Sequence, residues 1–529
     1  MLVLLPVFLL IILALAILVW YQFRPSISYL WLMAAGAALL TWGVVLAFHW
    51  IMPQPFSMEV WSIGVESPLT LTWALDQFSW PYAFAMSSLL LAVMLTEAAR
   101  LQEPATPLLW IGSLAVNGAA LLGVMANNPI TIILAWTLID IIEGWVILSN
   151  AHDAKKIDRT ALAFFVRIFG SLAVLWAMAF STAQGVVLDF ENIFPETGIF
   201  LLIAVGLRLG VVPLHLPITE ELDVRRGLGT LIRFASPASS LVLLGHLPGG
   251  MQSASVASLL GSLSVLVCLY GALMWASSSD AISGRPFWLI SLTSMAMSIS
   301  LGGAPELSVI PGMALIFLGA VLFLFTQRSR WMMFIPLAAC VSMVGMPFTP
   351  AAGSLQYLFA APFNLTDLSY LLAYTFLLAG YIRHARRISL GPEKLERWLV
   401  VVFPAGLFVL IGGYWALMAI IPEIFFNPGV WWASALIALL TFGGVAAIDK
   451  YGKILVERSP WSVIVLKRIG QFTSNFLGLD WIYRFGNWIF RIFQRINQFL
   501  VTMLEGDGGV LWAMVLLMLL LSFFYRGGR

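Results

Sequence analysis

Apolar runs of about twenty residues fill most of this 529-residue chain, and short polar loops separate them. A helix needs about 20 apolar residues to cross the hydrocarbon core of a bilayer, so each run has the length of one crossing. Only 10% of the residues are charged, whereas a soluble protein of this size carries about 25%. The chain is therefore expected to be an all-α, polytopic membrane protein.

The runs predict about sixteen transmembrane helices. The first eight are expected near residues 1–20, 28–50, 78–97, 107–125, 129–149, 160–181, 197–217 and 229–246. The other eight are expected near residues 254–276, 286–303, 309–326, 331–349, 366–383, 398–421, 430–448 and 508–525. The first run has no basic segment before it and no small-residue cleavage site after it, which favours a membrane span over a cleaved signal peptide.

The charged loops give these spans an orientation. The basic loops all fall on one side of the predicted membrane, at residues 151–159, 225–226, 327–330, 383–397 and 450–468. The acidic loops 188–196 and 422–429 fall on the other side. Lysine and arginine collect on the cytoplasmic side of membrane proteins, so the N-terminus is expected to face outward.

The segment of residues 470–504 differs from the spans because its apolar and basic residues alternate with the period of a helix. In DWIYRFGNWIFRIFQRINQFL (480–500), isoleucine and phenylalanine recur every three or four residues, while Arg484, Arg491 and Arg495 lie on the opposite side. This pattern predicts a C-terminal amphipathic helix that lies laterally along a membrane or protein surface. A surface anchor and a strut to a neighbouring subunit fit the pattern equally well.

Prolines interrupt two spans in corresponding places. Pro213 lies in the seventh span, and Pro347 and Pro350 lie at the end of the twelfth. A proline inside a span removes a backbone hydrogen bond that lipid cannot replace. Broken helices in matching positions are typical of transporters with inverted repeats, so spans 4–8 and 9–13 are interpreted as two inverted five-helix repeats. The alternative is that the prolines only kink two membrane helices.

This organisation divides the chain into five expected regions. They are N-terminal transmembrane helices (1–106), a first inverted repeat (107–246), a second inverted repeat (254–383), additional transmembrane helices (384–450), and the surface helix with the final crossing (451–529). The odd number of spans in each repeat gives the two repeats opposite orientations in the membrane.

Ionisable residues inside the spans are few. The candidates for an ion path or for buried ion pairs are Asp140, Glu143, Arg208, His215 and Arg233, with Arg167 also near the middle of its span. A charge at mid-bilayer costs about 2.5–3.5 kcal/mol on the insertion scale, so these groups should face one another or water. Asp140 and Glu143 share one face of the fifth span, and Arg208 is expected to pair with one of them.

His215 lies seven residues after Arg208. The two residues share a helical face if the helix continues past Pro213. A structural histidine and a proton relay are both consistent with a histidine near the end of a span.

Other functional classes find no support in the sequence. The net charge is +2, which gives no electrostatic basis for binding nucleic acid. The two cysteines, Cys268 and Cys340, lie in apolar runs, and the sequence contains no motif of a metal, phosphate-loop, flavin, haem or iron–sulfur site. No catalytic residue, metal or cofactor is therefore expected in this chain.

Several stretches resemble the antiporter-like membrane subunits of respiratory complex I (NADH-quinone oxidoreductase) and of Mrp-type cation/proton antiporters. LRLGVVPLHLPI (207–218) resembles the GKSAQFPLHTWLP motif. When this alignment is continued without a gap, GTLIRFASPASS (229–240) falls where the family has SALIHAATM. LDQFS (75–79) resembles LDPLS, ANNPITIILAWTL (126–138) resembles ADNLLLLFLFWEL, and GMALIFLGA (312–320) resembles KALLFLGAG. In span count, surface helix and final crossing, the chain is most similar to the large L-type member.

The resemblance implies a proton or cation translocating subunit in a bacterial plasma (inner) membrane, with other membrane subunits of a complex-I-like or Mrp-like assembly as partners. The key residues depart from the family pattern. In the first half, the family's span-five glutamate falls on Thr137, its span-seven lysine on Arg208 and its span-eight histidine on Arg233. In the second half, the central lysine falls on Met313 and the neighbouring histidine on Val309. The span-twelve lysine or acid falls near Leu355. A buried lysine can release its proton, whereas an arginine stays charged.

Three functional hypotheses follow. The first is an antiporter-like translocating subunit whose own transport is impaired or rerouted. The second is a degenerate structural paralogue that only scaffolds the membrane arm of such an assembly. The third, an unrelated polytopic enzyme acting on lipid-linked substrates, is disfavoured because the polar loops are only a few tens of residues long.

Overall fold

The computed structural model describes most of the chain. The described residues are 1–23, 27–61, 69–100, 107–150, 154–190, 193–215, 225–248, 255–326, 331–359, 363–387, 397–428, 430–458, 480–505 and 508–526. The chain divides into two compact units, Met1–Pro460 and Trp461–Arg529. The first unit holds every candidate site residue predicted from the sequence.

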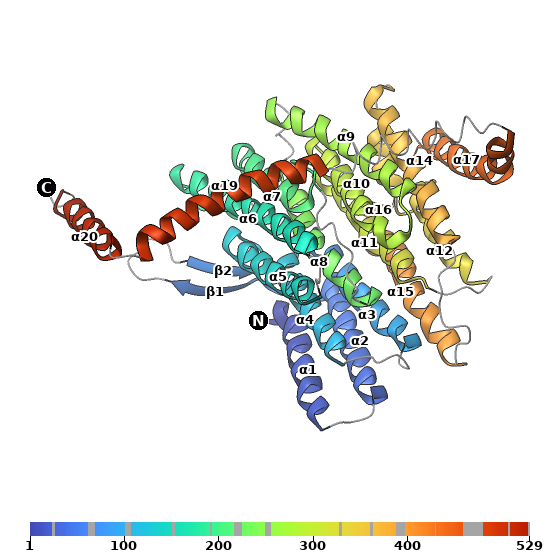
Figure 1. Cartoon of the computed structure of the whole chain (residues 1–529). Helices are drawn as coiled ribbons and strands as arrows, with labels where there is room; N and C mark the ends of the chain where they lie inside the picture. The colour runs from blue at the N-terminus through green and yellow to red at the C-terminus, as the bar shows by residue number, and fades with distance from the viewer. Residues whose placement is uncertain are drawn as a thin grey trace. The chain divides into compact units, whose positions relative to one another are not determined.

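Helices make up almost all of the first unit (Figure 1). Its first half contains α1 (Leu5–Gln22), α2 (Ile27–Ile51), α3 (Ser79–Glu97), α4 (Pro107–Val124), α5 (Pro129–Asn150), α6 (Ala154–Ala183), α7 (Pro195–Leu209) and α8 (Arg226–Gly245). Its second half contains α9 (Ser255–Ser277), α10 (Ala281–Leu301), α11 (Val309–Leu324), α12 (Phe334–Val344), α13 (Ala352–Phe359), α14 (Leu365–Ala385), α15 (Leu399–Ile420), α16 (Pro422–Phe425) and α17 (Trp431–Arg458).

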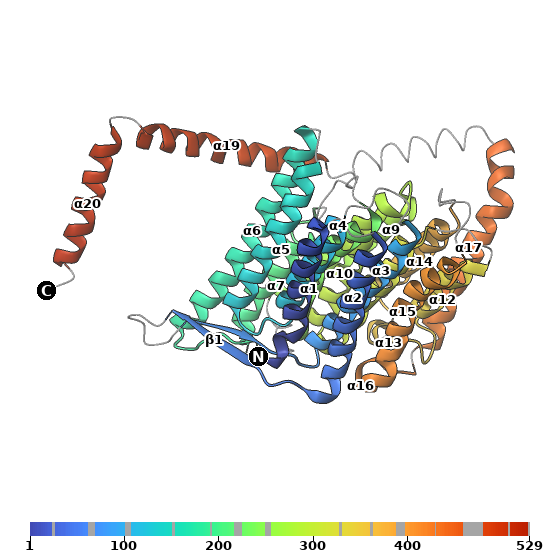
Figure 2. The same ribbon diagram turned by 90° about the horizontal axis from the view of Figure 1, so that it is seen from below.

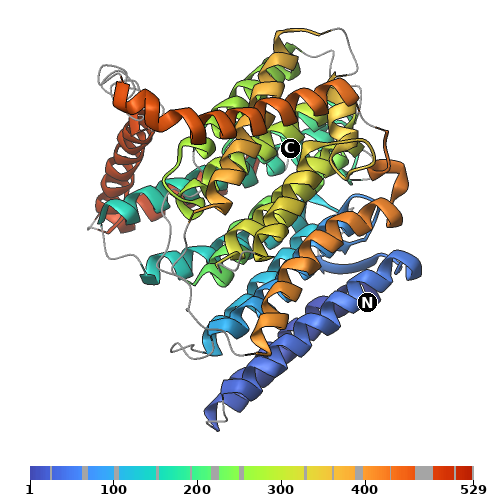
Figure 3. The same cartoon turned by 90° about the vertical axis from the view of Figure 1, so that its right-hand side faces the viewer.

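Each of the sixteen predicted spans coincides with a helix of the described chain, the last being α20 (Gly508–Arg526). Ten helices in the described residues are long and apolar enough to cross a membrane, and three shorter apolar helices accompany them. The fold class predicted from hydropathy, an all-α polytopic membrane protein, is confirmed. The long helices of the first unit run alongside one another (Figure 3).

Three helices form the centre of the first unit. Almost every residue of α3, α8 and α11 is buried, although these helices are as apolar as membrane spans. By contrast, α1, α2, α5 and α6 each leave most of one side exposed. Helices that are apolar all round belong in the interior of a bundle, and helices with one exposed apolar side face lipid or a neighbouring subunit.

Both predicted helix breaks are present. Helix α7 ends at Leu209, before Pro213, and Gly210 follows in the left-handed conformation with φ 78°. Helix α12 ends at Val344, before Pro347, and Gly345 follows with φ 69°. Glycine adopts this conformation without a Cβ clash, so each helix ends on a left-handed glycine cap.

A two-stranded antiparallel sheet is the one non-helical element of the described chain. Strand β1 (Phe56–Trp61) pairs with β2 (Leu69–Trp73), with Phe56 opposite Trp73. Figure 2 shows the hairpin beside the N-terminal end of α1. The Thr72 carbonyl oxygen accepts a hydrogen bond from the Asn127 amide, which ties β2 to the segment before α5.

The second unit contains the predicted amphipathic helix. Helix α19 (Asp480–Glu505) is followed by α20, the final apolar helix (Figure 2). On α19 both the aromatic side chains Phe485 and Trp488 and the basic side chains Arg491 and Arg495 are exposed within this unit. An exposed apolar face beside a basic face agrees with a helix that lies along a surface.

Candidate functional site

The charged residues predicted from the sequence come from four consecutive helices. Asp140 and Glu143 lie one turn apart on α5, Arg167 lies on α6, Arg208 on the last turn of α7, and Arg233 on α8. Ion pairs connect all five of them, and we call this set the charge cluster. The side chains of Glu143 and the three arginines are at most 4% exposed, and that of Asp140 is 17% exposed.

Arg208 forms the predicted ion pair with Asp140. Its Nη1 donates to Asp140 Oδ2 at 2.9 Å and its Nη2 donates to Asp140 Oδ1 at 3.0 Å, which is the two-pronged geometry that a guanidinium and a carboxylate prefer. Nη2 also lies 3.3 Å from Ser236 Oγ on α8. The guanidinium carbon lies 4.3 Å from the centre of the Trp136 ring. Hydrogen bonds and an aromatic face thus fix this group from several sides.

Arg167 joins the two carboxyl groups of α5. Its Nη1 donates to Glu143 Oε2 at 2.5 Å and to Asp140 Oδ1 at 3.1 Å. Arg233 approaches the same glutamate from α8, with Nη1 at 3.8 Å from Glu143 Oε1. The cluster therefore consists of three guanidinium groups arranged around two adjacent carboxyl groups.

A glycine on α6 makes room for Arg208. A Cβ atom added to Gly170 would lie 2.7 Å from Arg208 Cγ and 3.1 Å from the carbonyl oxygen of Ala204 on α7. Side chains are not found at such distances, so α6 and α7 can approach this closely only because residue 170 is glycine. The approach brings Arg208 and Arg167 to the same carboxyl group.

Arg208 and His215 do not share a helical face, because the condition for it, a helix that continues past Pro213, is not met. Helix α7 ends at Leu209, so the six residues that follow form a turn and not another helical turn. The His215 amide donates to the Gly210 carbonyl oxygen at 3.0 Å, and His215 Nδ1 lies 2.7 Å from the Pro213 carbonyl oxygen. His215 is buried at 4% exposure. Both of these contacts are to the turn itself.

The positions that differ from the family pattern have distinct surroundings. Thr137 lies on the exposed side of α5, where its hydroxyl donates to the Ile133 carbonyl oxygen at 2.7 Å, so Asp140 and not Thr137 faces the cluster. In the second half, Met313 and Val309 of α11 and Leu355 of α13 are completely buried. These three side chains fill space and carry no charge.

Three charged contacts were not predicted from the sequence. Arg285 on α10 is buried with its guanidinium carbon 4.8 Å from the centre of the Phe323 ring. Arg225 donates to Glu97 at 3.3 Å, which joins the start of α8 to the end of α3. His246 Nε2 lies 3.2 Å from Asp76 Oδ2. The residues of the last two pairs lie at helix ends, where hydropathy alone does not separate a loop charge from a paired one.

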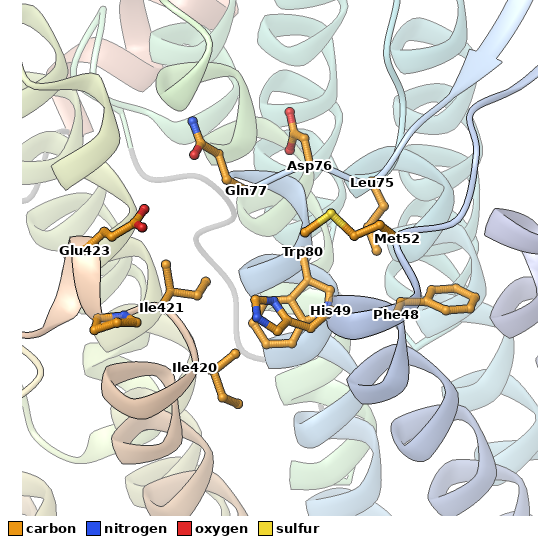
Figure 4. A pocket seen from close by; sticks show the side chains of 11 residues that line it. Phe48, His49, Met52, Leu75, Asp76, Gln77, Trp80, Ile420, Ile421 and Glu423 are labelled. Carbon is orange, nitrogen blue, oxygen red and sulfur yellow. The ribbon is translucent and has the colours of Figure 1, made fainter.

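A separate cavity of about 320 Å³ lies between the C-terminal ends of α2 and α15 and the start of α3 (Figure 4). Glu423 extends toward it from α16, and His49 lies against Trp80 with 4.8 Å between the ring centres. Asp76 also lines the cavity, but its Oδ1 accepts hydrogen bonds from the Phe78 and Ser79 amides at the start of α3. Asp76 is therefore part of a helix cap.

The charge cluster limits the chemistry that this region can perform. A guanidinium cannot release its proton near neutral pH, so the three arginines act as fixed positive charges. Among the members of the cluster, only Asp140 and Glu143 carry carboxyl groups, which unlike a guanidinium can bind and release a proton. Any proton passing through the cluster must therefore use these carboxyl groups or water beside them.

The fold is similar to that of two solved membrane complexes. No protein-family model and no curated protein matches the sequence. A chain of the Mrp complex from Dietzia sp. DQ12-45-1b matches with a TM-score of 0.67 and 14% identity, over 100% of this chain and 63% of that chain. A chain of the membrane-bound sulfane sulfur reductase, an archaeal respiratory membrane complex, matches with a TM-score of 0.67 and 14% identity, over 98% of this chain and 99% of that chain.

The TM-scores show that the chain shares its fold with both of these proteins. The chain is a multi-pass membrane protein with the architecture of chains from an Mrp complex and a respiratory membrane complex. It spans 63% of the length of the Mrp chain and nearly all of the sulfane sulfur reductase chain.

Proposed function

We propose that this chain is an antiporter-like membrane subunit of a larger assembly, of the Mrp-like or complex-I-like kind, and that it translocates protons or cations. The shared fold supports the membrane subunit, and the motifs around residues 207–218 and 229–240 support the antiporter-like class. Its partners are other membrane subunits within a bacterial plasma membrane, and its N-terminus faces outward. Spans 4–8 and 9–13 are the two inverted repeats that build the transport path.

The observation that carries this proposal is the charge cluster at the break of α7. Five charged side chains meet between the apolar helices α5, α6, α7 and α8. One of them, Arg208, lies in the last turn of the broken helix α7. Buried charges within a membrane protein are costly and mark ion or proton pathways more often than not. A helix break beside them is the arrangement found at the binding sites of transporters with inverted repeats.

In this proposal the arginines set the electrostatics, and the carboxyl groups exchange the proton. Arg208 holds a permanent charge where the family has a lysine that switches. Proton exchange at Asp140 changes the charge that Arg208 and Arg167 both face. The buried Met313 and Val309 provide no such group in α11, so transport is impaired or follows a different route in the second half.

The second candidate is a structural paralogue that scaffolds a membrane arm. It is favoured by the geometry of Asp140, whose two oxygen atoms together accept three hydrogen bonds from Arg208 and Arg167. A carboxyl group engaged in this way holds α5, α6 and α7 in register. Protonating it would break interactions worth several kcal/mol, which opposes a role as a proton carrier.

The two candidates are separated by proton flux measured per assembled complex. In proteoliposomes that contain the complete assembly, Arg208→Lys should raise flux per complex if the chain translocates ions, because lysine can release a proton at this position. A loss of assembly with unchanged flux per remaining complex would instead support the scaffold. Arg495→Lys, on the exposed face of α19, is the matched control and should alter neither quantity.

A further inference from the structure

A groove with an arginine rim lies between α14 and α17, away from the charge cluster. It encloses a cavity of about 450 Å³. Arg383, Arg386 and Arg387 line one part of it, and Phe376, Leu440 and Gly444 line another. The two parts differ in chemistry, since one presents guanidinium groups and the other presents apolar side chains and backbone of α14 and α17. We call it the arginine groove.

The end of α9 positions two of these arginines. Arg383 Nη1 donates to the Ala276 carbonyl oxygen, and Arg387 Nη1 lies 3.5 Å from the Ser278 carbonyl oxygen. The C-terminal end of a helix carries a partial negative charge, which explains why cationic side chains collect there. A guanidinium has five N–H donors, so these backbone contacts leave further donors on both groups for a ligand.

All three arginines line the same cavity at the end of α14. Arg383 lies in the last turn of the helix, Arg386 is its C-cap residue, and Arg387 follows directly. Arg386 and Arg387 are exposed, and Arg383 is half-buried. Like charges gathered around one cavity repel one another and favour a ligand with negative charge.

The apolar part of the groove is open. A Cβ atom added to Gly444 would meet no atom within 4 Å. The same is true of Gly443, the preceding residue on α17, which does not line the groove. The chain therefore leaves space beside Gly444 that its own side chains do not fill.

We propose that the arginine groove binds an anionic phospholipid, with its phosphate at Arg383, Arg386 and Arg387 and an acyl chain along Phe376 and Leu440. Basic pockets between transmembrane helices bind anionic lipid headgroups in this way. A free phosphate would use the arginines but would leave the apolar wall empty. An acidic segment of another protein would likewise gain nothing from an open apolar channel beside Gly444, so a lipid is the ligand that uses both parts.

Lipid binding to the complete purified assembly tests this proposal. Native mass spectrometry in a neutral detergent would measure dissociation constants for phosphatidylglycerol and phosphatidylcholine. The wild-type protein should bind phosphatidylglycerol at least tenfold more tightly. Each arginine near a membrane surface contributes about fivefold to the binding of an anionic lipid. Arg386→Gln with Arg387→Gln should therefore weaken phosphatidylglycerol binding about thirtyfold and leave phosphatidylcholine unchanged.

The apolar part is tested with a matched pair of glycine variants. Gly444→Leu should fill the groove and weaken phosphatidylglycerol binding, whereas Gly443→Leu makes the same chemical change one residue away and should not. Size-exclusion chromatography and circular dichroism of both variants confirm that they are folded.

Three results would overturn the proposal. Equal affinity of the wild-type protein for the two lipids would remove the selectivity for anionic headgroups. Full competition by inorganic phosphate, together with equal effects of the two glycine variants, would identify a site for a free anion. Loss of a co-purifying subunit in the arginine variant, with unchanged lipid binding, would identify a protein docking surface.

Discussion

The region of α5–α8 and the region of α10–α12 differ in the kind of side chain that fills the interior of the bundle. In the first, carboxyl and guanidinium groups from four helices meet in the charge cluster. In the second, α11 is completely buried, and Met313 and Val309 pack within it as apolar residues. Ion pairs demand particular partners in a particular geometry, whereas apolar packing demands mainly the right volume. A substitution that conserves volume should therefore be costly in the first region and tolerated in the second.

Both regions contain buried charge, and they differ in the groups that can exchange a proton. Arg285 is buried in α10 and faces the Phe323 ring of α11. It carries a permanent charge, as Arg208 does. Within the described residues, two carboxyl groups accompany the arginines of the first region, whereas α11 carries the buried, uncharged Met313.

The largest expected effect comes from removing a carboxylate from the charge cluster. Asp140→Asn should lower the free energy of unfolding by about 3–5 kcal/mol, because Arg208 and Arg167 would lose a buried charged partner. The measurement is the unfolding transition of the purified protein in detergent. Thr137→Asn, one turn earlier on the exposed side of the same helix, is the control and should change little. An unchanged transition for Asp140→Asn would remove the ion pairs from the stability of this region.

A somewhat smaller effect is expected from Met313 in the second region. Met313→Ala should cost about 2–5 kcal/mol through the cavity it leaves, and Met313→Leu should cost less than about 1.5 kcal/mol because it conserves volume. The same unfolding measurement ranks the two variants. If Met313→Leu were as damaging as Met313→Ala, the thioether would have a specific role, and volume alone would not explain the position.

Gly170 provides a third test. Gly170→Ala should destabilise by about 1–3 kcal/mol, because the new methyl group would displace the Arg208 side chain or separate α6 from α7. Gly261→Ala on α9 has open space around it and should be neutral or slightly stabilising, since alanine favours a helix. A neutral Gly170→Ala would show that the contact between α6 and α7 adjusts easily.

The smallest expected effect concerns Asp280, which lies outside the membrane spans at the start of α10. Its carboxylate accepts hydrogen bonds from the Ile282 and Ser283 amides and forms a capping box with Ser283. Asp280→Ala should cost about 1 kcal/mol, whereas Asp280→Asn, which also caps helices, should cost less.

The same cap predicts a pH dependence. Partial burial raises the pKa of Asp280, but the hydrogen bonds from Ser283, Ser279 and Ile282 outweigh it and hold the pKa below the ordinary value of 3.8. A depressed pKa in the folded state stabilises the protein above the ordinary value, and this contribution is lost as the pH falls through the lowered value. The difference in stability between wild type and Asp280→Ala should therefore be constant from pH 7 to about pH 5 and disappear in stronger acid.

Hydropathy and helix-breaking residues were enough to predict much of the fold. All sixteen predicted spans coincide with helices, because the length of an apolar run is set by the thickness of the bilayer. The breaks of α7 and α12 were predicted from Pro213 and Pro347, although each helix ends several residues before its proline. The ending depends on the left-handed glycines, which a proline signal does not locate. The inverted repeats and the regions drawn from them stay predictions.

The partners within the charge cluster were only partly predictable. The pair of Arg208 and Asp140 followed from the cost of an isolated charge in the membrane. For Arg167 the sequence indicated no partner beyond the same two carboxyl groups. The close approach of α6 to α7 at Gly170, which brings Arg167 and Arg208 to the same carboxyl group, was not predicted. Spacing alone did not place His215, because an interval of seven residues defines a shared helical face only while the helix continues, and α7 ends at Leu209.

The two left-handed glycines have an electrostatic consequence. Each leaves the C-terminal end of a helix, with its partial negative charge, inside the bundle. In α7 the last turn contains Arg208, which offsets that charge, whereas the last turn of α12 contains no basic residue. The two breaks therefore differ in local charge, because a cation near Gly345 would meet the partial negative charge of a helix end whose last turn contains no basic residue.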